Sequence, residues 1–385
     1  MQHRDDPYSV NALYDAYLKA IKSSKWKTSA QKYSHDFLSE IAELSEEILS
    51  GNYHSDPTSE FLINERGKTR FVCGNTVRDR VARHALCDNV LMPAIREKVR
   101  YDNAASQTGK GTDFCRERLK QHLHEYYRKN GTNGFILIGD ISKYYDNVRH
   151  DIAEKQFADL IGNDEISMKL LHEVFEQMAV DVTCLPEEDR MHCMERKFNS
   201  VEFYGKYGLD RKRGKYFMHK SLKTGDQTSQ LVGIYYLHEI DNLIQCVYGI
   251  RYFGRFNDDF YVISSSKDQL HKLLEDIRKE LAALGLELND KKTVICRIDR
   301  PFKFMQNNYW VTDTGRVPEK LNPKNIRRER VKLKKLKAHN VPREEAEQQY
   351  KSWIGTYHKK MSKQQIRNME DLFASLYGKD EKKDE

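Results

Sequence analysis

The sequence predicts an α+β fold, and two kinds of pattern carry that prediction. Amphipathic helical spacing recurs along residues 8–50, where we expect two helices, and again along residues 266–284. Between these segments lie short β-rich runs such as residues 135–138. With 385 residues and 39% apolar content, the chain can bury a sizeable core distributed over two or three domains.

The composition narrows the class of protein only slightly. A net charge of +7 has the sign expected of a polyphosphate-binding protein, but it is too small to decide the matter. Seven cysteines form no C-x-x-C pair, which favours reduced thiols and a cytoplasmic location. Zinc binding by Cys184, His192 and Cys193 is a weaker interpretation than loop residues. The sequence has no run of eighteen apolar residues and no apolar leader, so we expect no membrane span.

The first elements expected are helical. The apolar faces of the two N-terminal helices are predicted to be Val10, Leu13, Tyr14 and Tyr17 in the first, and Phe37, Ile41, Leu44 and Ile48 in the second. Gly51 ends the second helix. Residues 60–72 alternate like a hairpin around Arg66 and Gly67, and residues 78–100 return to helical spacing.

The middle of the chain predicts a buried strand followed by a charged insertion. Residues 135–138 are wholly apolar and lead directly to Asp140, as in a strand that delivers a carboxylate to a sheet edge. Residues 185–220 lack periodicity and are rich in charge, including Asp210 to Arg213, so we expect an exposed insertion.

Three further elements are predicted after the insertion. They are a helix over residues 229–243, a hairpin around residues 257–259, and a helix over residues 266–284 that ends at Gly285. Beyond Pro323 the composition shifts, because residues 324–337 contain eight lysines or arginines around a thin apolar seam. A separate helical domain is expected there, followed by a disordered charged tail at residues 379–385.

Three aspartates could together support nucleotidyl transfer. That reaction uses two divalent ions about 3.5 to 4 Å apart, so carboxylates must converge from separate strands. Asp140 and the pair Asp258 and Asp259 follow or join β-rich runs and meet this requirement. Taken singly, each has a simpler interpretation: Asp140 as a helix N-cap, and the pair as a polar hairpin turn.

Four ordered segments resemble the motifs of prokaryotic reverse transcriptases, including group II intron-like, diversity-generating retroelement and phage-defence enzymes. Residues 68–70, 79–80 and 106–112 also resemble the fingers pattern of these families, so the resemblance covers roughly residues 10–375. In order, the motifs are residues 135–146 (motif A), Lys223 to Gln230 (motif B), Arg255 to Asp259 (motif C) and Gly285 to Thr293 (motif D).

The resemblance implies a right-hand polymerase whose palm is an antiparallel sheet packed on helices. The implied domains are an N-terminal helical extension (1–58), fingers (59–133), a palm (134–312) with an insertion near 185–220, and a helical thumb (313–378), followed by the tail (379–385).

The resemblance also implies roles at the metal site. Asp140 and Asp258 would bind both Mg²⁺ ions, for which Mn²⁺ is a substitute, while Asp259 and the Ile141 carbonyl complete the ligand set. Lys292 is expected to protonate the leaving pyrophosphate, with a solvated lysine turn as the alternative.

A second group of residues is expected to bind the incoming nucleotide. Cations would neutralise its triphosphate, an aromatic ring would act as the steric gate under its sugar, and a glycine would let the backbone approach the nascent base pair. The gate residue has a core aromatic as its alternative interpretation. These residues are Lys68, Arg70 and Arg80 for the triphosphate, Tyr145 for the gate, Gly225 for the close approach, and Gln230 near the templating base.

Nucleic-acid binding is expected from basic residues outside this group. They are Lys110 in the fingers and Lys324, Arg327, Arg328 and Lys335 in the thumb helix, where they would contact phosphates without reading sequence. Trp353 also resembles the thumb end of these enzymes. The implied partners are an RNA template, a DNA product and dNTPs, with an accessory protein or non-coding RNA as a further candidate. Gly109 to Thr112 lacks the glycine spacing of a P-loop.

The departures from the family pattern bear on the subfamily. Motif B ends in Ser229 and Gln230, which resembles diversity-generating and defence-associated enzymes more than intron maturases, and Thr224 departs from the diversity-generating pattern. The expected primer grip, residues 302–310, lacks a glycine.

The expected function is therefore RNA-templated DNA synthesis by a two-metal mechanism in a phage-defence (antiviral) or prophage system. The alternatives are a diversity-generating reverse transcriptase, a template-independent or protein-primed DNA polymerase, an RNA polymerase, and an inactive scaffold.

Overall fold

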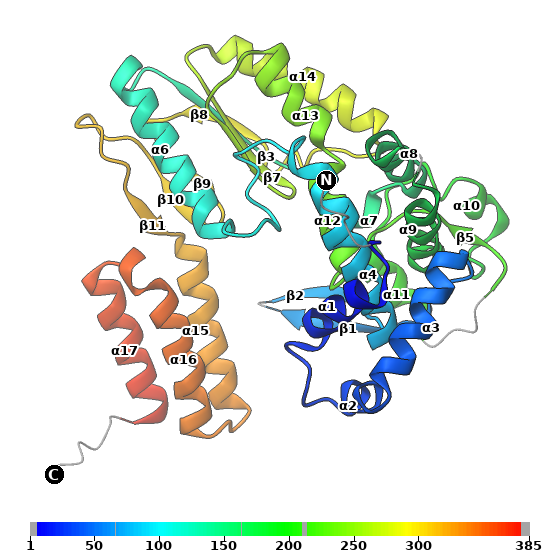
Figure 1. Ribbon diagram of the computed structural model, residues 1–385. Coiled ribbons are helices and arrows are strands. Elements are labelled where there is room, and N and C mark those ends of the chain that lie inside the picture. The colour runs from blue at the N-terminus through cyan, green and yellow to red at the C-terminus, as the bar shows by residue number, and fades with distance from the viewer. Residues whose placement is uncertain (1–5, 66, 163, 210–213, 379–385) are drawn as a thin grey trace. The chain divides into compact units, whose positions relative to one another are not determined.

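The computed structural model describes residues 6–65, 67–162, 164–209 and 214–378, and mixes helices with sheets (Figure 1). The α+β class is thereby confirmed. Contacts divide the chain into two units. One unit comprises the chain as far as Cys115, Gly139–Phe260 and His271–Thr293, and the other comprises Arg116–Ile138, Tyr261–Leu270 and the chain from Val294 onward. The strands β3 (Phe135–Asp140) and β7 (Asp259–Ser264) pass from one unit to the other.

The N-terminal segment forms three helices, so the prediction of two was wrong. They are α1 (Val10–Ile21), α2 (Thr28–His35) and α3 (Phe37–Ser50). The extra boundary follows residue 21 because residues 22–27 are mostly Lys and Ser and offer no apolar stripe to bury. Gly51, with a φ of 71°, ends α3 as predicted.

The predicted face of α1 was also only half right. Leu13 and Tyr17 are buried, but Val10 and Tyr14 are 44% and 41% exposed. The neighbouring α-helical positions Ala16 and Ala20 are buried instead, so the buried stripe is rotated toward smaller side chains.

The next elements follow the prediction. The strands β1 (Ser59–Glu65) and β2 (Lys68–Gly74) form an antiparallel hairpin in which Glu65 faces Lys68, while Arg66 lies outside the described residues. The helices α4 (Val77–Leu86) and α5 (Met92–Arg96), joined by a π-helical turn, form the expected helical stretch. α6 (Thr112–Asn130) follows.

The central sheet contains the strand that was predicted to deliver Asp140. Its order is β6-β7-β3-β8, with β6 at Phe253–Phe256 and β8 at Val294–Arg297. Ile136 to Ile138 are buried, as their wholly apolar pattern predicts. The hairpin expected around residues 257–259 is confirmed as the β6–β7 connection. A separate sheet, β11-β10-β9, contains β9 (Phe302–Phe304), β10 (Asn307–Tyr309) and β11 (Glu319–Leu321).

The helix predicted over residues 229–243 is broken. It consists of α12 (Gln227–Tyr235), α13 (His238–Asn242) and a π-helical turn, with Tyr236 and Leu237 at the break. Both residues at the break are fully buried. Because the segment is buried nearly all round, no change in amphipathic spacing marks the interruption. By contrast, α14 (Lys267–Ala283) matches its prediction and has Leu270, Leu273, Ile277 and Leu281 fully buried.

The prediction of an exposed insertion near 185–220 was wrong for its aromatic residues. This segment contains α10 (Glu187–Met191), α11 (Ser200–Tyr207) and β5 (Phe217–Met218), which pairs with β4 (Val180–Asp181). Phe198, Phe203 and Tyr204 are buried in one cluster with Phe71 of β2, on whose ring Tyr204 stacks. The residues in contact are far apart in the sequence, so the local pattern, which is rich in charge, did not indicate that these aromatic side chains are buried. Asp210 to Arg213 lie outside the described residues.

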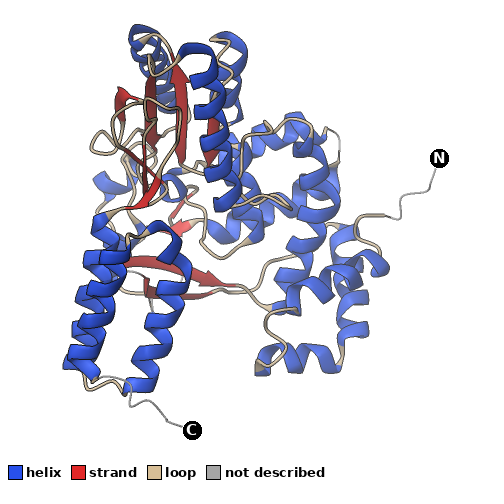
Figure 2. Ribbon diagram, turned by 90° about the vertical axis from the view of Figure 1, so that its left-hand side faces the viewer, coloured by secondary structure: helices blue, strands red, loops and turns tan. Residues whose placement is uncertain are grey.

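The C-terminal helices are α15 (Pro323–Ala338), α16 (Arg343–Tyr357) and α17 (Lys363–Tyr377), which lie together in Figure 2. As predicted, α15 is a basic helix, and Leu333 of its apolar seam is buried. The shared core of the three helices consists of Leu333, Ala346, Tyr350, Met369 and Phe373. The tail expected at residues 379–385 lies outside the described residues.

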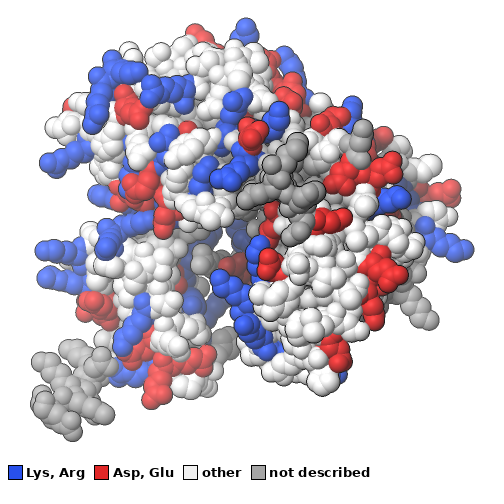
Figure 3. Space-filling model, viewed as in Figure 1, with Lys and Arg blue, Asp and Glu red and all other residues white. Residues whose placement is uncertain are grey.

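Basic and acidic side chains are interspersed on the face drawn in Figure 3, so the net charge does not appear there as one uniformly basic surface. Among the described residues, no helix combines the length and apolarity needed to cross a bilayer.

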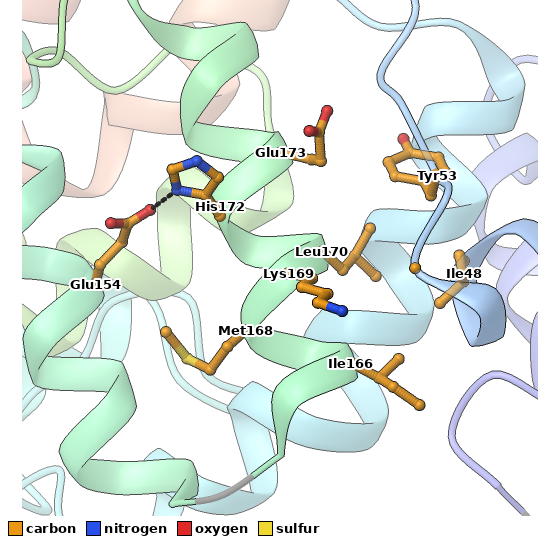
Figure 4. A pocket seen from close by; sticks show the side chains of 10 residues that line it. Ile48, Tyr53, Glu154, Ile166, Met168, Lys169, Leu170, His172 and Glu173 are labelled. Atoms are coloured by element: carbon orange, nitrogen blue, oxygen red, sulfur yellow. Dashed lines mark hydrogen bonds and ion pairs between the residues drawn. The ribbon is translucent and has the colours of Figure 1, made fainter.

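A cavity of about 370 Å³ lies between α3, α8 (His150–Ile161) and α9 (Glu165–Met178) (Figure 4). Its lining includes Tyr53, Glu154 and His172, and it contains none of the predicted site residues.

Candidate active site

The first unit brings the three predicted aspartates together. Asp140 is the last residue of β3, Asp258 lies in the two-residue turn between β6 and β7, and Asp259 begins β7. The Ile141 amide donates to the Asp258 carbonyl at 3.2 Å, and the Asn289 amide donates to the Asp140 carbonyl at 2.8 Å. Main-chain hydrogen bonds thus hold together the segments that resemble motifs A, C and D, and the position of the carboxylates does not depend on side-chain contacts alone.

A glycine makes the close approach of motifs A and C sterically feasible. A Cβ atom on Gly139 would lie 2.2 Å from the ring of Phe260. Real Cβ atoms do not approach other atoms so closely, so any other residue would force the buried ring of Phe260, or the strand that carries it, to shift. Gly139 therefore leaves room for the Phe260 ring beside Asp140.

A buried arginine fixes the turn that bears Asp258. Arg255 donates to both carboxylate oxygens of Asp241, at 2.8 and 2.6 Å, and both residues are almost completely buried. The same guanidinium donates to the carbonyls of Asn257 at 3.1 Å and Ile234 at 2.9 Å. Asn257 has a φ of 53°, a left-handed conformation that Asn tolerates better than most residues. Sequence analysis missed this role, although a charge between Gly254 and Phe256 in a β-rich run was a usable sign.

Burial and mutual repulsion oppose ionisation in the acidic cluster formed by Asp140, Asp258 and Asp259. Burial raises the pKa of Asp258, and the charge of Asp140 raises it further. Burial likewise raises the pKa of Asp259, with additional effects from Asp258 and Asp140. The positive charges of Lys292 and Lys68 oppose the increase at Asp258. A cluster in which two carboxyl groups resist ionisation is one that a cation would stabilise.

Lys292 is a direct partner of the cluster. Its Nζ lies 2.8 and 2.6 Å from the two oxygens of Asp140. Burial lowers the pKa of Lys292, but the hydrogen bonds and charge of Asp140 outweigh that effect and raise it overall. The structure therefore brings the predicted Lys292 into direct contact with the predicted Asp140.

The residues present fit a hard divalent cation by their chemistry, because carboxylate oxygens are the ligands that Mg²⁺ prefers. Within the described ranges, no three His, Cys, Asp or Glu side chains already form a metal-ligating group. Both oxygens of Asp140 are occupied by Lys292. A metal would therefore compete with Lys292 for this carboxylate.

The three predicted triphosphate cations differ in their surroundings. Lys68 begins β2 and is close enough to influence the pKa of Asp258. Arg70 pairs with Glu65 at 3.2 Å on the exposed surface of the hairpin. Arg80 donates to the Ser24 hydroxyl at 3.2 Å, and its burial lowers the pKa of its guanidinium. The structure thus associates Lys68 with the acidic cluster and gives Arg70 and Arg80 other partners.

Tyr145 lies near the acidic cluster. It belongs to the short helix α7 (Tyr144–Asn147) and is half-buried. Burial, with a further contribution from the charge of Asp258, raises its pKa to about 12. The position expected for the steric gate is therefore adjacent to Asp258.

Gly225 and Gln230 lie at the start of α12. Gly225 has a φ of 103°, and a Cβ there would lie 3.4 Å from the Cys73 carbonyl oxygen of β2. The next residue, Asp226, caps α12 by accepting from the Ser229 amide, and also forms a buried ion pair with Arg83 of α4. Gln230 is exposed. Sequence analysis missed the pair of Arg83 and Asp226, whose partners are 143 residues apart.

The predicted nucleic-acid contacts fall into two groups. Lys110 is bound within its own loop, because its Nζ donates to the Tyr101 carbonyl at 2.7 Å and to Gln107 at 3.0 Å. In the second unit, Trp353 packs beside Tyr350 in the helical core. The basic residues of α15, all exposed, are Lys324, Arg327, Arg328 and Lys335.

Comparison with known proteins identifies one family. The model of the reverse transcriptase (RNA-dependent DNA polymerase) family matches residues 59–308. No curated protein matches the chain in sequence.

Similar solved structures include telomerases from two Candida species. Apo telomerase from Candida tropicalis truncated from its C-terminal domain is 16% identical, with a TM-score of 0.45, and the match covers 73% of this chain and 60% of that one. The apo Candida tropicalis telomerase is 15% identical, with a TM-score of 0.45 and coverages of 84% and 64%. Candida albicans telomerase in complex with a TWJ fragment of telomeric RNA is 12% identical, with a TM-score of 0.44 and coverages of 89% and 63%. This chain thus matches about three fifths of the length of each telomerase.

The family match extends over well more than half of the chain and includes all three aspartates and Lys292. The same residues converge in the first unit, as described above. This chain belongs to the reverse transcriptase family.

Proposed function

We propose that the protein synthesises DNA on an RNA template, using Asp140, Asp258 and Asp259 as its catalytic carboxylates. The observation that supports this most strongly is the convergence of the three residues from the end of β3 and the β6–β7 turn. Reverse transcriptase domains use divalent metal ions, and an acidic cluster with raised carboxyl pKa values suits such a cation.

In this proposal Asp140 and Asp258 would hold two Mg²⁺ ions, with Mn²⁺ as a substitute, and Asp259 and the Ile141 carbonyl would complete the ligands. Bound ions would supply charge stabilisation and lower the pKa of the primer hydroxyl. Lys292 would donate the proton that the departing pyrophosphate takes up. The hydrogen bonds from Lys292 to Asp140 support its presence at the reacting atoms.

The incoming dNTP would be bound by residues of the β1–β2 hairpin, α4, α7 and the start of α12. Lys68 neutralises triphosphate charge, and Arg70 and Arg80 do so only if they exchange their present partners. Tyr145 excludes a ribose 2′-hydroxyl by bulk. Gly225 and Gln230 then lie against the nascent base pair.

The template and product duplex would be bound through phosphates. The exposed cations of α15 suit this task because phosphate contacts require charge and reach but no base recognition. Lys110 contributes indirectly by stabilising its loop. The proposed domains remain fingers at 59–133, palm at 134–312 and thumb at 313–378, preceded by a helical extension.

We place the enzyme in a phage-defence or prophage system in the cytoplasm, with an accessory protein or a non-coding RNA as a further partner. The motif B ending at Ser229 and Gln230 argues against an intron maturase, and Thr224 supports this setting over a diversity-generating retroelement. The alternative is template-independent or protein-primed synthesis by the same carboxylates. The experiment must distinguish it from synthesis on an RNA template.

The test is dNTP incorporation by the purified protein with Mg²⁺, before and after ribonuclease removes co-purified RNA, followed by sequencing of the product. The variants are Asp258→Asn and, as a matched control, Asp159→Asn on the exposed surface of α8. We expect RNA-dependent product from the wild type and from Asp159→Asn, and none from Asp258→Asn. Nucleic-acid affinity should stay within a few fold of wild type in both variants.

Other outcomes separate the alternatives. Product that survives ribonuclease treatment and has no RNA-encoded sequence would replace templated synthesis with untemplated synthesis. Equal loss of synthesis and nucleic-acid affinity in Asp258→Asn would contradict a catalytic role for this residue.

A further inference from the structure

Gly233 occupies a position where its backbone does not require a glycine. It lies inside α12 and is buried, and its φ is outside the left-handed region. Glycine is the weakest helix former apart from proline, because it loses the most backbone entropy on folding. A buried glycine inside a helix therefore needs a reason in its surroundings.

The surroundings supply that reason. A Cβ atom on Gly233 would lie 3.0 Å from the hydroxyl oxygen of Tyr145 and 3.2 Å from its Cζ. Contacts this short require the neighbouring ring to move by a few tenths of an ångström. The ring of Tyr145 thus rests on the part of α12 that has no side chain.

α7 is held by two hydrogen bonds near this contact, one from a side chain and one to its main chain. The Tyr144 hydroxyl donates to the Gly233 carbonyl at 2.7 Å. The Leu222 amide donates to the Tyr145 carbonyl at 2.7 Å. Because these bonds hold the backbone, an added methyl group at Gly233 would displace the Tyr145 ring more readily than the whole helix.

The ring also lies close to the catalytic residues. The segment that leads into α7 is bonded to the turn of Asp258, because the Ile141 amide donates to the Asp258 carbonyl at 3.2 Å. Tyr145 is only half-buried, and the charge of Asp258 acts on its hydroxyl. Displacement of the ring from α12 would therefore change the space beside the acidic cluster.

We propose that Gly233 is a positioning residue that sets how far the Tyr145 ring extends into the site for the nucleotide sugar. The proposal rests on the proposed function, because Tyr145 limits a sugar only if the site binds a nucleoside triphosphate. Gly233 lets the gate ring recede far enough to admit a deoxyribose while the ring still blocks a 2′-hydroxyl.

The main variant is Gly233→Ala. We expect the KM for dNTPs to rise roughly tenfold, as overpacking of this size implies. The kcat at saturating dNTP should change much less, because the aspartates are not touched. In a Tyr145→Ala background, which should itself admit ribonucleotides, Gly233→Ala should no longer raise the KM. Tyr145→Phe removes the nearest atom and should reduce the effect.

The matched control is Gly205→Ala. Gly205 also lies within a helix, α11, and a Cβ there meets no atom within 4 Å. This variant should raise the melting temperature slightly and leave the KM unchanged. All variants are measured by steady-state incorporation of dNTPs and ribonucleotides, with dNTP binding in Ca²⁺ by calorimetry as a readout independent of chemistry.

The outcomes separate this proposal from the proposed function. If the wild type incorporates dNTPs and Gly233→Ala has the KM of Gly205→Ala, only the role of Gly233 is overturned. An equal KM increase with and without Tyr145 would overturn it too. If the wild type neither incorporates nor binds dNTPs, the proposed function is wrong, and the role of Gly233 is then wrong as well. Should Gly233→Ala not fold, it must fold in the Tyr145→Ala background, and failure there would contradict the proposal.

Discussion

The acidic site of the first unit and the helix α15 of the second unit use charge in opposite ways. Asp140 is buried, and burial with mutual repulsion raises the pKa values of Asp258 and Asp259. The cations of α15 are exposed to water along a helix whose apolar seam is buried elsewhere. Ionising the buried carboxyl groups of the first region costs free energy, which neighbouring groups of the fold must offset. The charges on α15 are solvated by water and need few protein contacts.

This difference predicts how each region responds to substitution. The acidic site depends on close approaches and buried hydrogen bonds, so single changes there should alter stability and activity together. On α15, each cation should act almost independently and mainly on nucleic-acid affinity.

The largest expected effect comes from Arg255→Met. The substitution leaves Asp241 buried without its partner, which costs ~3–5 kcal/mol of the free energy of unfolding. Urea denaturation would measure this loss. Adding Asp241→Leu should restore most of the stability, because an apolar pair can replace a buried ion pair. It should not restore synthesis, because the hydrogen bond to the Asn257 carbonyl is still missing. Full activity in the double variant would contradict the positioning role of Arg255.

Gly139→Ala should have the next largest effect. The new Cβ would overlap the ring of Phe260, and overpacking of this kind typically costs about 1–3 kcal/mol. Thermal unfolding and dNTP incorporation should both decline. A second substitution, Phe260→Leu, should restore part of each loss by making room. If Gly139→Ala unfolds at the wild-type temperature, the Phe260 ring does not pack against Gly139 as closely as described.

Asp259→Asn tests whether the cluster is destabilising without metal. The raised carboxyl pKa values mean that the folded chain binds more protons than the unfolded chain. Stability should therefore fall as pH rises from about 4 through the raised values. At pH 8 without divalent ions, Asp259→Asn should stabilise the fold by ~1 kcal/mol while lowering synthesis. Mg²⁺ should stabilise the wild type more than the variant. Equal stability of both proteins across this pH range would refute the account of the cluster.

The smallest effect on stability is expected on α15. Replacing Arg327 by Gln should change the free energy of unfolding by no more than about 0.5 kcal/mol. It should weaken binding to an RNA–DNA duplex and reduce the slope of log affinity against log salt by just under one unit, as for one lost phosphate contact. Lys363→Gln, at the start of α17, is the matched control. If the two variants have the same slope of log affinity against log salt, α15 does not contact nucleic acid through Arg327.

The elements that sequence analysis predicted well are those with a strong local pattern. The apolar run before Asp140, the hairpin around Asp258, the leucine stripe of α14 and the basic helix α15 all appear where expected. Each depends on periodicity or turn preference over a few residues. The resemblance to reverse transcriptases then brought Asp140, Asp258, Asp259 and Lys292 into one site, which spacing alone could not do.

The remaining features depend on contacts between distant residues. The bond from Arg255 to Asp241 and the stacking of Tyr204 on Phe71 leave little local trace in the sequence. The break at Tyr236 is concealed because its surroundings are buried all round. At Gly139 and Gly233 a side chain would clash with residues that are distant in sequence. These neighbours are known only from the three-dimensional structure.

The central claim is that three converging carboxylates catalyse DNA synthesis on RNA. The most direct measurement is single-turnover extension of a DNA primer on an RNA template of defined sequence with Mg²⁺, comparing the wild type with Asp258→Asn. The account predicts wild-type product complementary to the template and a loss of at least about a thousandfold in the variant, as expected when a group that acts directly in the transition state is removed. Complementary product formed by Asp258→Asn at a rate close to wild type would contradict it.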